Sequence, residues 1–403
     1  MADRETALHA GIVPIAPVAS RWPEYGEDEV AAVTRVLESG RVNALVHGEE
    51  NRAFEREFAE FVGMPFAIAV ANGTVSLEMG LRALGVGPGD EVIVPARSFF
   101  ATASCVVAAG AQPVFADVQL HSQNIDPVSV ARMISSRTRA VLCVHLAGRP
   151  CEMDALLTLC STNGIALIED CAQAHGATYR GKKVGSFGDC ASFSFCTDKI
   201  MSTGGEGGMV LFRKEAAWER AMAYKDHGKN PAKLRSPTIV APGEFRYTHD
   251  SFGSNFRLTE MQAAIGRVQL RKLPDWIKQR QANATRLQGL LAGLPGIVVD
   301  AVKGCLAPSW YKFYVRVDTA KLPAGMRRGD LLAGLMRLGI QCGSGACPDM
   351  SREAAFSNCE PKRDGDLERA RELGSTTIML PIDHLLDDRD MDNIAAAFRE
   401  VLS

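Results

Sequence analysis

This sequence lacks a charge surplus, a long apolar run and a cysteine framework. Lys and Arg total 45 against 47 Asp and Glu over 403 residues, which gives a formal net charge of −2. A nucleic-acid partner is disfavoured, because neutralising phosphates needs a basic surplus on one face. No stretch approaches the roughly 20 apolar residues of a membrane span, so we expect no membrane contact.

The eleven cysteines are scattered, are odd in number and form no CxxC pair. They therefore indicate neither a disulfide framework nor a thiolate zinc site, and we expect no metal. Residues 1–20 also lack the basic start and the apolar core of a secretory signal. Together these absences predict a cytoplasmic enzyme.

The sequence does contain enough apolar residues, 46% against 23% charged, to fold into two or three domains. From residue 66 onward, short apolar runs alternate with helically spaced stretches, which predicts a parallel sheet covered on both faces by helices. The predicted strands are 66–71, 91–95, 113–117, 140–146, 165–170, 191–195 and 209–212. The predicted helices before and between them are 27–40, 51–62, 75–84, 101–109, 128–135 and 153–162.

A second unit follows a long helical pattern over 258–291. It contains a strand-like run at 312–317 and helical patterns near 328–338 and 390–402. We therefore expect an α/β protein with a large domain over 1–265 and a smaller α+β domain over 266–403.

Loops that follow the predicted strands are where ligands of open α/β sheets bind. The first loop, Asn72-Gly73-Thr74, opens a helix, and free N–H groups at a helix start bind anions. A plain N-cap explains the same residues. The second loop carries Phe99 and Phe100, which belong to the core unless one ring stacks on a flat cofactor.

The third loop places two carboxylates, Glu169 and Asp170, straight after an apolar strand. A buried carboxylate needs a cationic partner such as a protonated pyridine, although a helix cap or a salt bridge would also satisfy it. The fourth loop carries Lys199 between strand 191–195 and the glycine-rich segment 204–208. This lysine is either a desolvated amine able to form a Schiff base or an ordinary surface residue.

An anion cradle, a stacking ring, a carboxylate and an amine are together what pyridoxal phosphate requires of its protein. The order of these motifs resembles the DegT/StrS-type sugar aminotransferases, which are pyridoxal-phosphate enzymes of the aspartate aminotransferase fold (fold type I). The resemblance runs from Trp22 to Pro348. It rests on Asn72-Gly73-Thr74, EDCAQAHG at 169–176, SFSFCTDK at 192–199, the glycines of 204–208 and SNFRLTEMQ at 254–262.

The resemblance implies a mostly parallel seven-stranded sheet in the large domain and two catalytic residues. Lys199 is implied as the Schiff-base lysine and Asp170 as the partner of the pyridine nitrogen. Gln173 is implied to lie against the ring or its hydroxyl. His175 follows the family pattern without a role that we can assign.

The remaining cofactor contacts implied by the resemblance come from this chain and from a second chain. Gly73, Thr74 and Ser194 are implied to bind the phosphate, and Phe99 to stack on the ring. Asn255 is implied to reach the phosphate from a neighbouring subunit. Sites shared in this way imply a homodimer.

The implied reaction moves an amino group from L-glutamate or glutamine to a keto sugar, linked to a nucleotide. Some members of the family carry His at the lysine position and act as dehydratases, so Lys199 favours transamination. The residues at 198–201 and 225–228 are similar to those of a subgroup associated with surface polysaccharide sugars. The usual aromatic-rich stretch near the substrate reads Ser309-Trp310-Tyr311-Lys312 here, and variation in this stretch leaves the substrate open.

Three other functions compete with this interpretation. The same cofactor chemistry acts on a keto-cyclitol or an aromatic-precursor ketone in similar enzymes. A nucleotide-dependent oxidoreductase is allowed by the architecture alone. The glycines of 85–89, however, follow a helix and precede a strand, which is the reverse of the dinucleotide-binding order. A non-catalytic regulator that binds the cofactor or a sugar is disfavoured by the presence of both Lys199 and Asp170.

Overall fold

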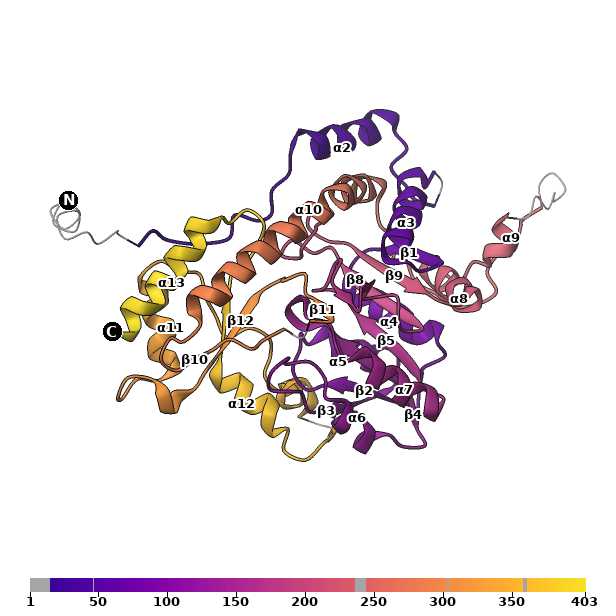
Figure 1. Cartoon of the computed structure of the whole chain (residues 1–403). Helices are drawn as coiled ribbons and strands as arrows, with labels where there is room; N and C mark the ends of the chain where they lie inside the picture. Colours follow the sequence, from indigo (N-terminus) through magenta and orange to yellow (C-terminus); the bar gives the residue numbers. More distant parts are fainter. Residues whose placement is uncertain (1–14, 46, 236–243, 303, 358–360) are drawn as a thin grey trace.

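The computed structural model describes residues 15–45, 47–235, 244–302, 304–357 and 361–403. Its main sheet contains, in spatial order, β1 (Phe66–Val70), β9 (Gly208–Phe212), β8 (Cys190–Ser194), β5 (Ala166–Asp170), β4 (Thr138–Val144), β2 (Glu91–Pro95), β3 (Gln112–Ala116) and β13 (Lys362–Arg363) (Figure 1). Neighbouring strands from β8 to β13 pair in parallel, whereas β9 pairs antiparallel with both β8 and β1.

The predicted mostly parallel sheet of seven strands is confirmed, with one short addition. All residues of β2, β8 and β9 are buried, including the polar Glu91, Ser192 and Ser194. The eighth strand, β13, comes from the C-terminal part of the chain. Its two residues, Lys362 and Arg363, are charged and exposed, so no apolar run in the sequence signals it.

Helices cover both faces of this sheet because successive strand residues point to opposite sides. On β1, Ile68 and Val70 face one hydrophobic cluster, while Ala67 and Ala69 face another. The helices of this part are α2 (Glu27–Ser39), α3 (Glu49–Val62), α4 (Gly73–Ala83), α5 (Ala101–Ala108), α6 (Pro127–Met133), α7 (Met153–Asn163), α8 (Glu215–Lys225) and α9 (Pro231–Arg235).

The long helix α10 (Glu260–Leu291) connects the large sheet to the C-terminal part. It packs on α2 and α3 at one end and on α13 (Asp388–Leu402) toward the other, as Figure 1 shows. Thr259 and Gln262 form a capping box at its start. The predicted domain boundary at residue 265 falls inside this helix and stays a prediction.

The C-terminal part has its own small sheet and hydrophobic core. Phe313, Leu331 and Phe398 are buried in that core, and Val18 from the N-terminal segment joins them. Its strands and helices are β10 (Ile297–Val298), β12 (Phe313–Val317), β14 (Thr377–Leu380), α11 (Arg328–Arg337) and α12 (Glu368–Thr376). A third sheet consists of β11 (Leu306–Ala307), β6 (Thr178–Tyr179) and β7 (Lys182–Lys183).

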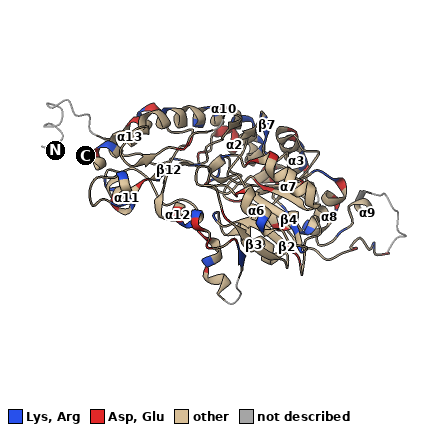
Figure 2. Ribbon diagram, turned by 60° about the horizontal axis from the view of Figure 1, so that its bottom comes forward, with Lys and Arg blue, Asp and Glu red and all other residues tan. Residues whose placement is uncertain are grey.

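Charged residues of both signs are interspersed over the helices and loops in the view of Figure 2. On this side, the near-zero net charge therefore does not result from two large, separate regions of opposite charge. Within the described ranges, no helix is long and apolar enough to cross a membrane.

Candidate active site

Asp170 ends β5 at the edge where the loops after the parallel strands meet. Its side chain is buried, and it accepts hydrogen bonds from the backbone N–H of Ala172 (3.1 Å) and the Thr102 hydroxyl (3.3 Å). Burial raises the pKa of this carboxyl, because a charge away from water is costly. Asp170 forms no ion pair with any residue that the structure describes, so its charge lacks a cationic partner.

Glu169, the preceding residue, is surrounded by donors. Its carboxylate accepts three backbone N–H bonds of 2.7–2.8 Å from the segment 185–188, and His145 Nε2 lies 3.1 Å away. Although burial opposes its charge, the His145 ring and these N–H groups hold the pKa of Glu169 below its ordinary value. His145 Nδ1 accepts the N–H of Cys151 (3.0 Å), so the ring hydrogen lies on Nε2 and is donated to Glu169.

His145, Glu169 and Cys171 also have side-chain atoms close enough to be read as metal ligands. The carboxylate oxygens of Glu169 and the ring nitrogens of His145 are, however, already engaged in the hydrogen bonds just described. The geometry is therefore that of a buried hydrogen-bonded pair behind the site.

At the start of α4, the loop after β1 lies close to the end of β8. The Asn72 side chain accepts the N–H of Val75 (3.0 Å), so the predicted capping role of Asn72 is present. Gly73 touches β8: a Cβ built on it would lie 2.6 Å from the Cβ of Ser194. Gly73 and Ser194 are thus brought together beside the helix N-terminus, and Thr74 next to them is exposed.

The two aromatic residues after β2 have different surroundings. Phe100 packs against Phe356, with ring centroids 5.8 Å apart, and belongs to the core. The Phe99 ring is 68% exposed, which leaves it available for stacking on a ligand. Its loop is tied to Asp170, because the hydroxyls of Ser98 and Thr102 are hydrogen-bonded (3.0 Å) and Thr102 donates to Asp170.

Lys199 lies in the loop after β8, with Nζ 3.2 Å from Asp198 Oδ1 and 3.4 Å from the Tyr311 hydroxyl. The Tyr311 hydroxyl also donates to Asp198. Gln173 is connected to this group through Ala147: the Ala147 N–H donates to Gln173 Oε1 (2.7 Å), and the Ala147 carbonyl accepts the N–H of Tyr311 (2.9 Å). Neither Asp198 nor Tyr311 was among the site residues expected from the sequence.

His175 and Asn255 stand apart from these contacts. His175 is fully buried between the rings of Phe193 and Phe195, and burial lowers its pKa to about 3, so it is neutral at physiological pH. Asn255 lies on an exposed segment that pairs with Asp226. In the described chain, Asn255 therefore lies at the surface.

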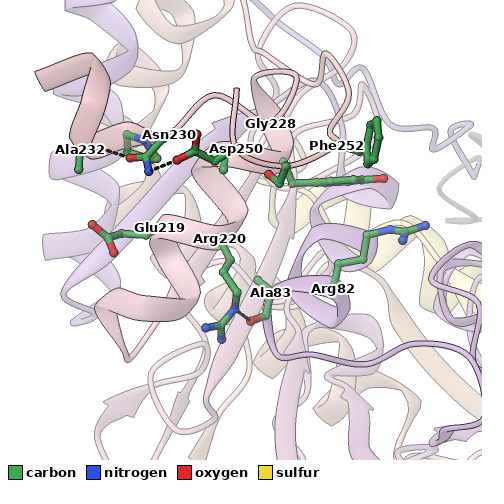
Figure 3. A pocket seen from close by; sticks show the side chains of 13 residues that line it. Arg82, Ala83, Glu219, Arg220, Gly228, Asn230, Ala232, Asp250 and Phe252 are labelled. Atoms are coloured by element: carbon green, nitrogen blue, oxygen red, sulfur yellow. Dashed lines mark hydrogen bonds between the residues drawn. The ribbon is translucent and has the colours of Figure 1, made fainter. Parts of the chain in front are cut away.

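A surface cavity of about 440 Å³ lies elsewhere, beside α4, α8 and the segment after α8 (Figure 3). Arg220 donates to the carbonyl of Ala83 and Asn230 donates to Asp250 at its wall. None of the site residues expected from the sequence lines this cavity. The candidate site is therefore the group of loops around Asp170 and Lys199.

Comparison with known proteins identifies the family. The sequence matches the DegT/DnrJ/EryC1/StrS aminotransferase family over residues 23–399. The chain belongs to this family. A solved aminotransferase from Psychrobacter cryohalolentis is 42% identical, with a TM-score of 0.91 over 95% of this chain and 98% of that one.

Two curated relatives have named activities. The dTDP-3-amino-3,4,6-trideoxy-alpha-D-glucose transaminase of Streptomyces venezuelae is 35% identical over 96% of each chain. The L-glutamine:2-deoxy-scyllo-inosose aminotransferase of Streptomyces fradiae is 36% identical over 94% of this chain and 93% of its own. These similarities decide among the enzyme classes that the sequence left open. The protein is a pyridoxal-phosphate-dependent aminotransferase rather than an oxidoreductase.

The residues present fit pyridoxal phosphate on structural grounds. Asp170 is a buried carboxylate without a cation, which suits a protonated pyridine nitrogen. Gly73 lies so close to Ser194 that no side chain fits there, and the Phe99 ring is open. The Lys199 amine is linked to the loop after Asp170 through Tyr311, Ala147 and Gln173.

Proposed function

We propose that this aminotransferase moves an amino group from L-glutamate or L-glutamine to a keto sugar carried on a nucleotide diphosphate. The product would serve surface polysaccharide or secondary-metabolite biosynthesis. The single observation that carries the proposal is a buried carboxylate without a cation, Asp170, at the same sheet edge as the half-buried amine of Lys199. The dTDP-linked amino sugar in the name of the S. venezuelae relative supports the substrate class.

In this proposal, Lys199 would hold the cofactor covalently and Asp170 would keep the pyridine nitrogen protonated. Pyridoxal phosphate would supply a ring that accepts an electron pair. Asp170 would support that charge electrostatically, because its carboxylate is buried. The amine of Lys199 would move a proton at the substrate carbon.

The remaining assignments concern binding. Gly73 and Thr74 offer the first N–H groups of α4 to the phosphate, and Ser194 adds a hydroxyl from β8. Phe99 covers the ring from one side. Gln173, fixed by its bond from the Ala147 N–H, lies against the ring or its hydroxyl.

A second subunit completes the site in this proposal. Phe245, Tyr247 and Phe252 are large aromatic residues exposed on the segment that leads to Asn255, and Phe252 also lines the cavity of Figure 3. Exposed apolar groups that gather on one segment mark interaction surfaces. A homodimer would cover them and would bring Asn255 to the phosphate of the neighbouring site.

Mixing inactive variants tests this shared site. In heterodimers of Lys199→Ala and Asn255→Ala chains, one of the two sites receives both lesions and the other receives none. Co-expression should therefore restore roughly a quarter of wild-type activity, by random pairing within a symmetric dimer. The matched control pairs Lys199→Ala with Asp170→Asn, two residues from the same chain, and should restore nothing. Equal recovery in both mixtures would contradict the assignment of Asn255 to the neighbouring site.

The reaction itself is tested by the visible absorbance of the purified protein, before and after addition of L-glutamate. Wild type should show a yellow band that glutamate converts to the colourless amine form, and Lys199→Ala should lack the band formed through its own lysine. L-glutamine in a parallel cuvette identifies the donor. A protein that stays colourless when supplied with pyridoxal phosphate would contradict the proposal.

A keto-cyclitol is the second candidate acceptor. The observation that favours it is the S. fradiae relative, whose name specifies glutamine and an inosose. Residues 309–312, the stretch expected near the substrate, lie next to Lys199 through Tyr311. Assaying nucleotide-linked keto sugars and keto-cyclitols with the same enzyme preparation separates the two classes by kcat/KM.

A further inference from the structure

Asp198 and Tyr311 touch the amine of Lys199 and have no part in the assignments above. We propose that they form a holding site for the free amine of Lys199. The site keeps the amine charged while it is not bonded to the cofactor, and it accepts a proton from the amine before the amine acts as a base. This inference rests on the proposed role of Lys199. It adds two proton-handling residues to the reaction.

The three polar groups form a closed triangle. Lys199 Nζ lies 3.2 Å and 3.4 Å from the two oxygens of Asp198 and 3.4 Å from the Tyr311 hydroxyl. The Tyr311 hydroxyl accepts from the amine and donates to Asp198. The amine therefore has both a negative charge and a neutral acceptor within hydrogen-bond reach.

The different exposure of the three side chains sets the direction in which a proton leaves Lys199. The Lys199 side chain is 17% exposed and Tyr311 is buried, whereas the Asp198 side chain is 54% exposed. A proton leaving the ammonium passes to Asp198 directly, or passes to the Tyr311 oxygen while the Tyr311 hydroxyl proton moves to Asp198. Either route leaves a neutral amine, an unchanged tyrosine and a protonated carboxyl. Water then takes the proton from the half-exposed Asp198.

Tyr311 is fixed in place by the turn after β4. Its N–H donates to the carbonyl of Ala147 (2.9 Å), and a Cβ at Gly148 would lie 2.7 Å from the backbone nitrogen of Trp310. Gly148 has φ of +85°, a conformation that other residues rarely adopt. The hydroxyl is thus presented to Lys199 by backbone packing that leaves it little freedom.

Other titratable groups interact with the charge of Lys199 but do not contact its nitrogen in the described residues. They are Asp170, His175, Cys196 and Lys312. His175 is neutral, and burial with the nearby Arg280 lowers the pKa of Lys312. Lys199 and the Tyr311 hydroxyl hold the pKa of Asp198 below its ordinary value although burial opposes this. Asp198 is therefore the anion that acts on the amine most directly.

The test measures how readily the Lys199 amine is labelled in the protein without cofactor. Amine-reactive labelling is followed against pH, and the modified Lys199 peptide is quantified by mass spectrometry. Asp198→Asn should raise the labelling of Lys199 at neutral pH about tenfold, because the amine loses the carboxylate that contacts it. Tyr311→Phe should give a smaller change in the same direction.

Glu206→Gln is the matched control. Glu206 is an exposed acid in the adjoining glycine-rich segment, and its carboxylate contacts Cys196 (3.6 Å) rather than Lys199. Its labelling curve should coincide with that of wild type. An Asp198→Asn curve that also coincides with wild type would overturn the proposal.

A second readout follows the uptake of pyridoxal phosphate by the visible band. Asp198→Asn should take up the cofactor faster, because its Lys199 amine is released from the ion pair with Asp198. Slower uptake with weaker binding would make Asp198 an ordinary cofactor ligand and would overturn the holding role. If the labelling shift is present but wild type forms no visible band, the failure lies in the proposed function and not in the Asp198 contact.

Discussion

Glu169 and Asp170 are consecutive residues of one strand and both are buried, yet their carboxylates have very different numbers of hydrogen-bond donors on the two sides of β5. Behind the strand, Glu169 has a donor for nearly every lone pair. On the cofactor side, Asp170 has two longer bonds and no cation within the described residues. The two carboxylates thus differ in their surroundings: Glu169 is satisfied by donors of the fold, and Asp170 is left without a cation among the described residues.

The largest expected effect is on stability, from Glu169→Gln. The amide would turn an N–H₂ group toward backbone N–H donors of the segment 185–188, and His145 would lose its charged acceptor. Breaking a buried pair of this kind lowers the free energy of unfolding by about 3–5 kcal/mol. Denaturant unfolding of the cofactor-free protein measures the loss. Glu206→Gln should change stability by less than about 0.5 kcal/mol.

Asp170→Asn should show the opposite pattern. Loss of the electrostatic partner should lower kcat by about 10²–10³-fold. The cofactor-free variant should unfold at the same denaturant concentration as wild type or at a higher one, because a costly buried charge is removed. Destabilisation as large as that of Glu169→Gln would erase the proposed difference between the two residues.

The two carboxylates should also affect the free energy of unfolding with opposite pH dependence. The pKa of Glu169 is lower in the folded state, so its contribution to stability is present above its ordinary value of 4.5 and is lost as pH falls through the folded pKa. The pKa of Asp170 is higher in the folded state, so its cost to stability grows as pH rises from 3.8 through the folded pKa. Unfolding curves of the two variants against pH should therefore differ from wild type with opposite slopes.

The smallest effect is expected at Thr102, which connects the hydroxyl of Ser98 to Asp170. Thr102→Val removes one donor and should lower the free energy of unfolding by about 1 kcal/mol. Thr102→Ser keeps the hydroxyl and should recover most of that loss. A Thr102→Val variant as stable as wild type, beside a destabilised Thr102→Ser, would point to the methyl group that serine lacks and not to the bond with Asp170.

Much of the fold was predictable because short apolar runs mark most strands of the main sheet. The exposed pair Lys362 and Arg363 of β13 has no such signal, and its strand exists only through pairing with β3. The loops that hold Gly73, Asp170 and Lys199 follow from the rule that ligands bind at the ends of parallel strands. The residue types in these loops predict the cofactor, and the roles of the single residues stay predictions.

The surroundings of these residues were not predictable in the same way. Tyr311 lies 112 residues from Lys199 along the chain, and only tertiary packing on Ala147 brings them together. Asp198 is adjacent to Lys199 in the sequence, but sequence position alone does not show that its carboxylate contacts the Lys199 amine. The difference between Glu169 and Asp170 depends on backbone N–H groups, which no sequence pattern displays.

The most direct test of the account is to locate the covalent bond to the cofactor. The protein is incubated with an equimolar amount of pyridoxal phosphate, reduced with borohydride and digested, and the modified peptide is identified by mass spectrometry. The account predicts modification of Lys199, and its loss in Lys199→Ala. Lys312 is the natural competitor, because burial lowers the pKa of its amine and makes it more nucleophilic at neutral pH. Modification of Lys312 in the wild-type protein, with Lys199 unmodified, would contradict the account.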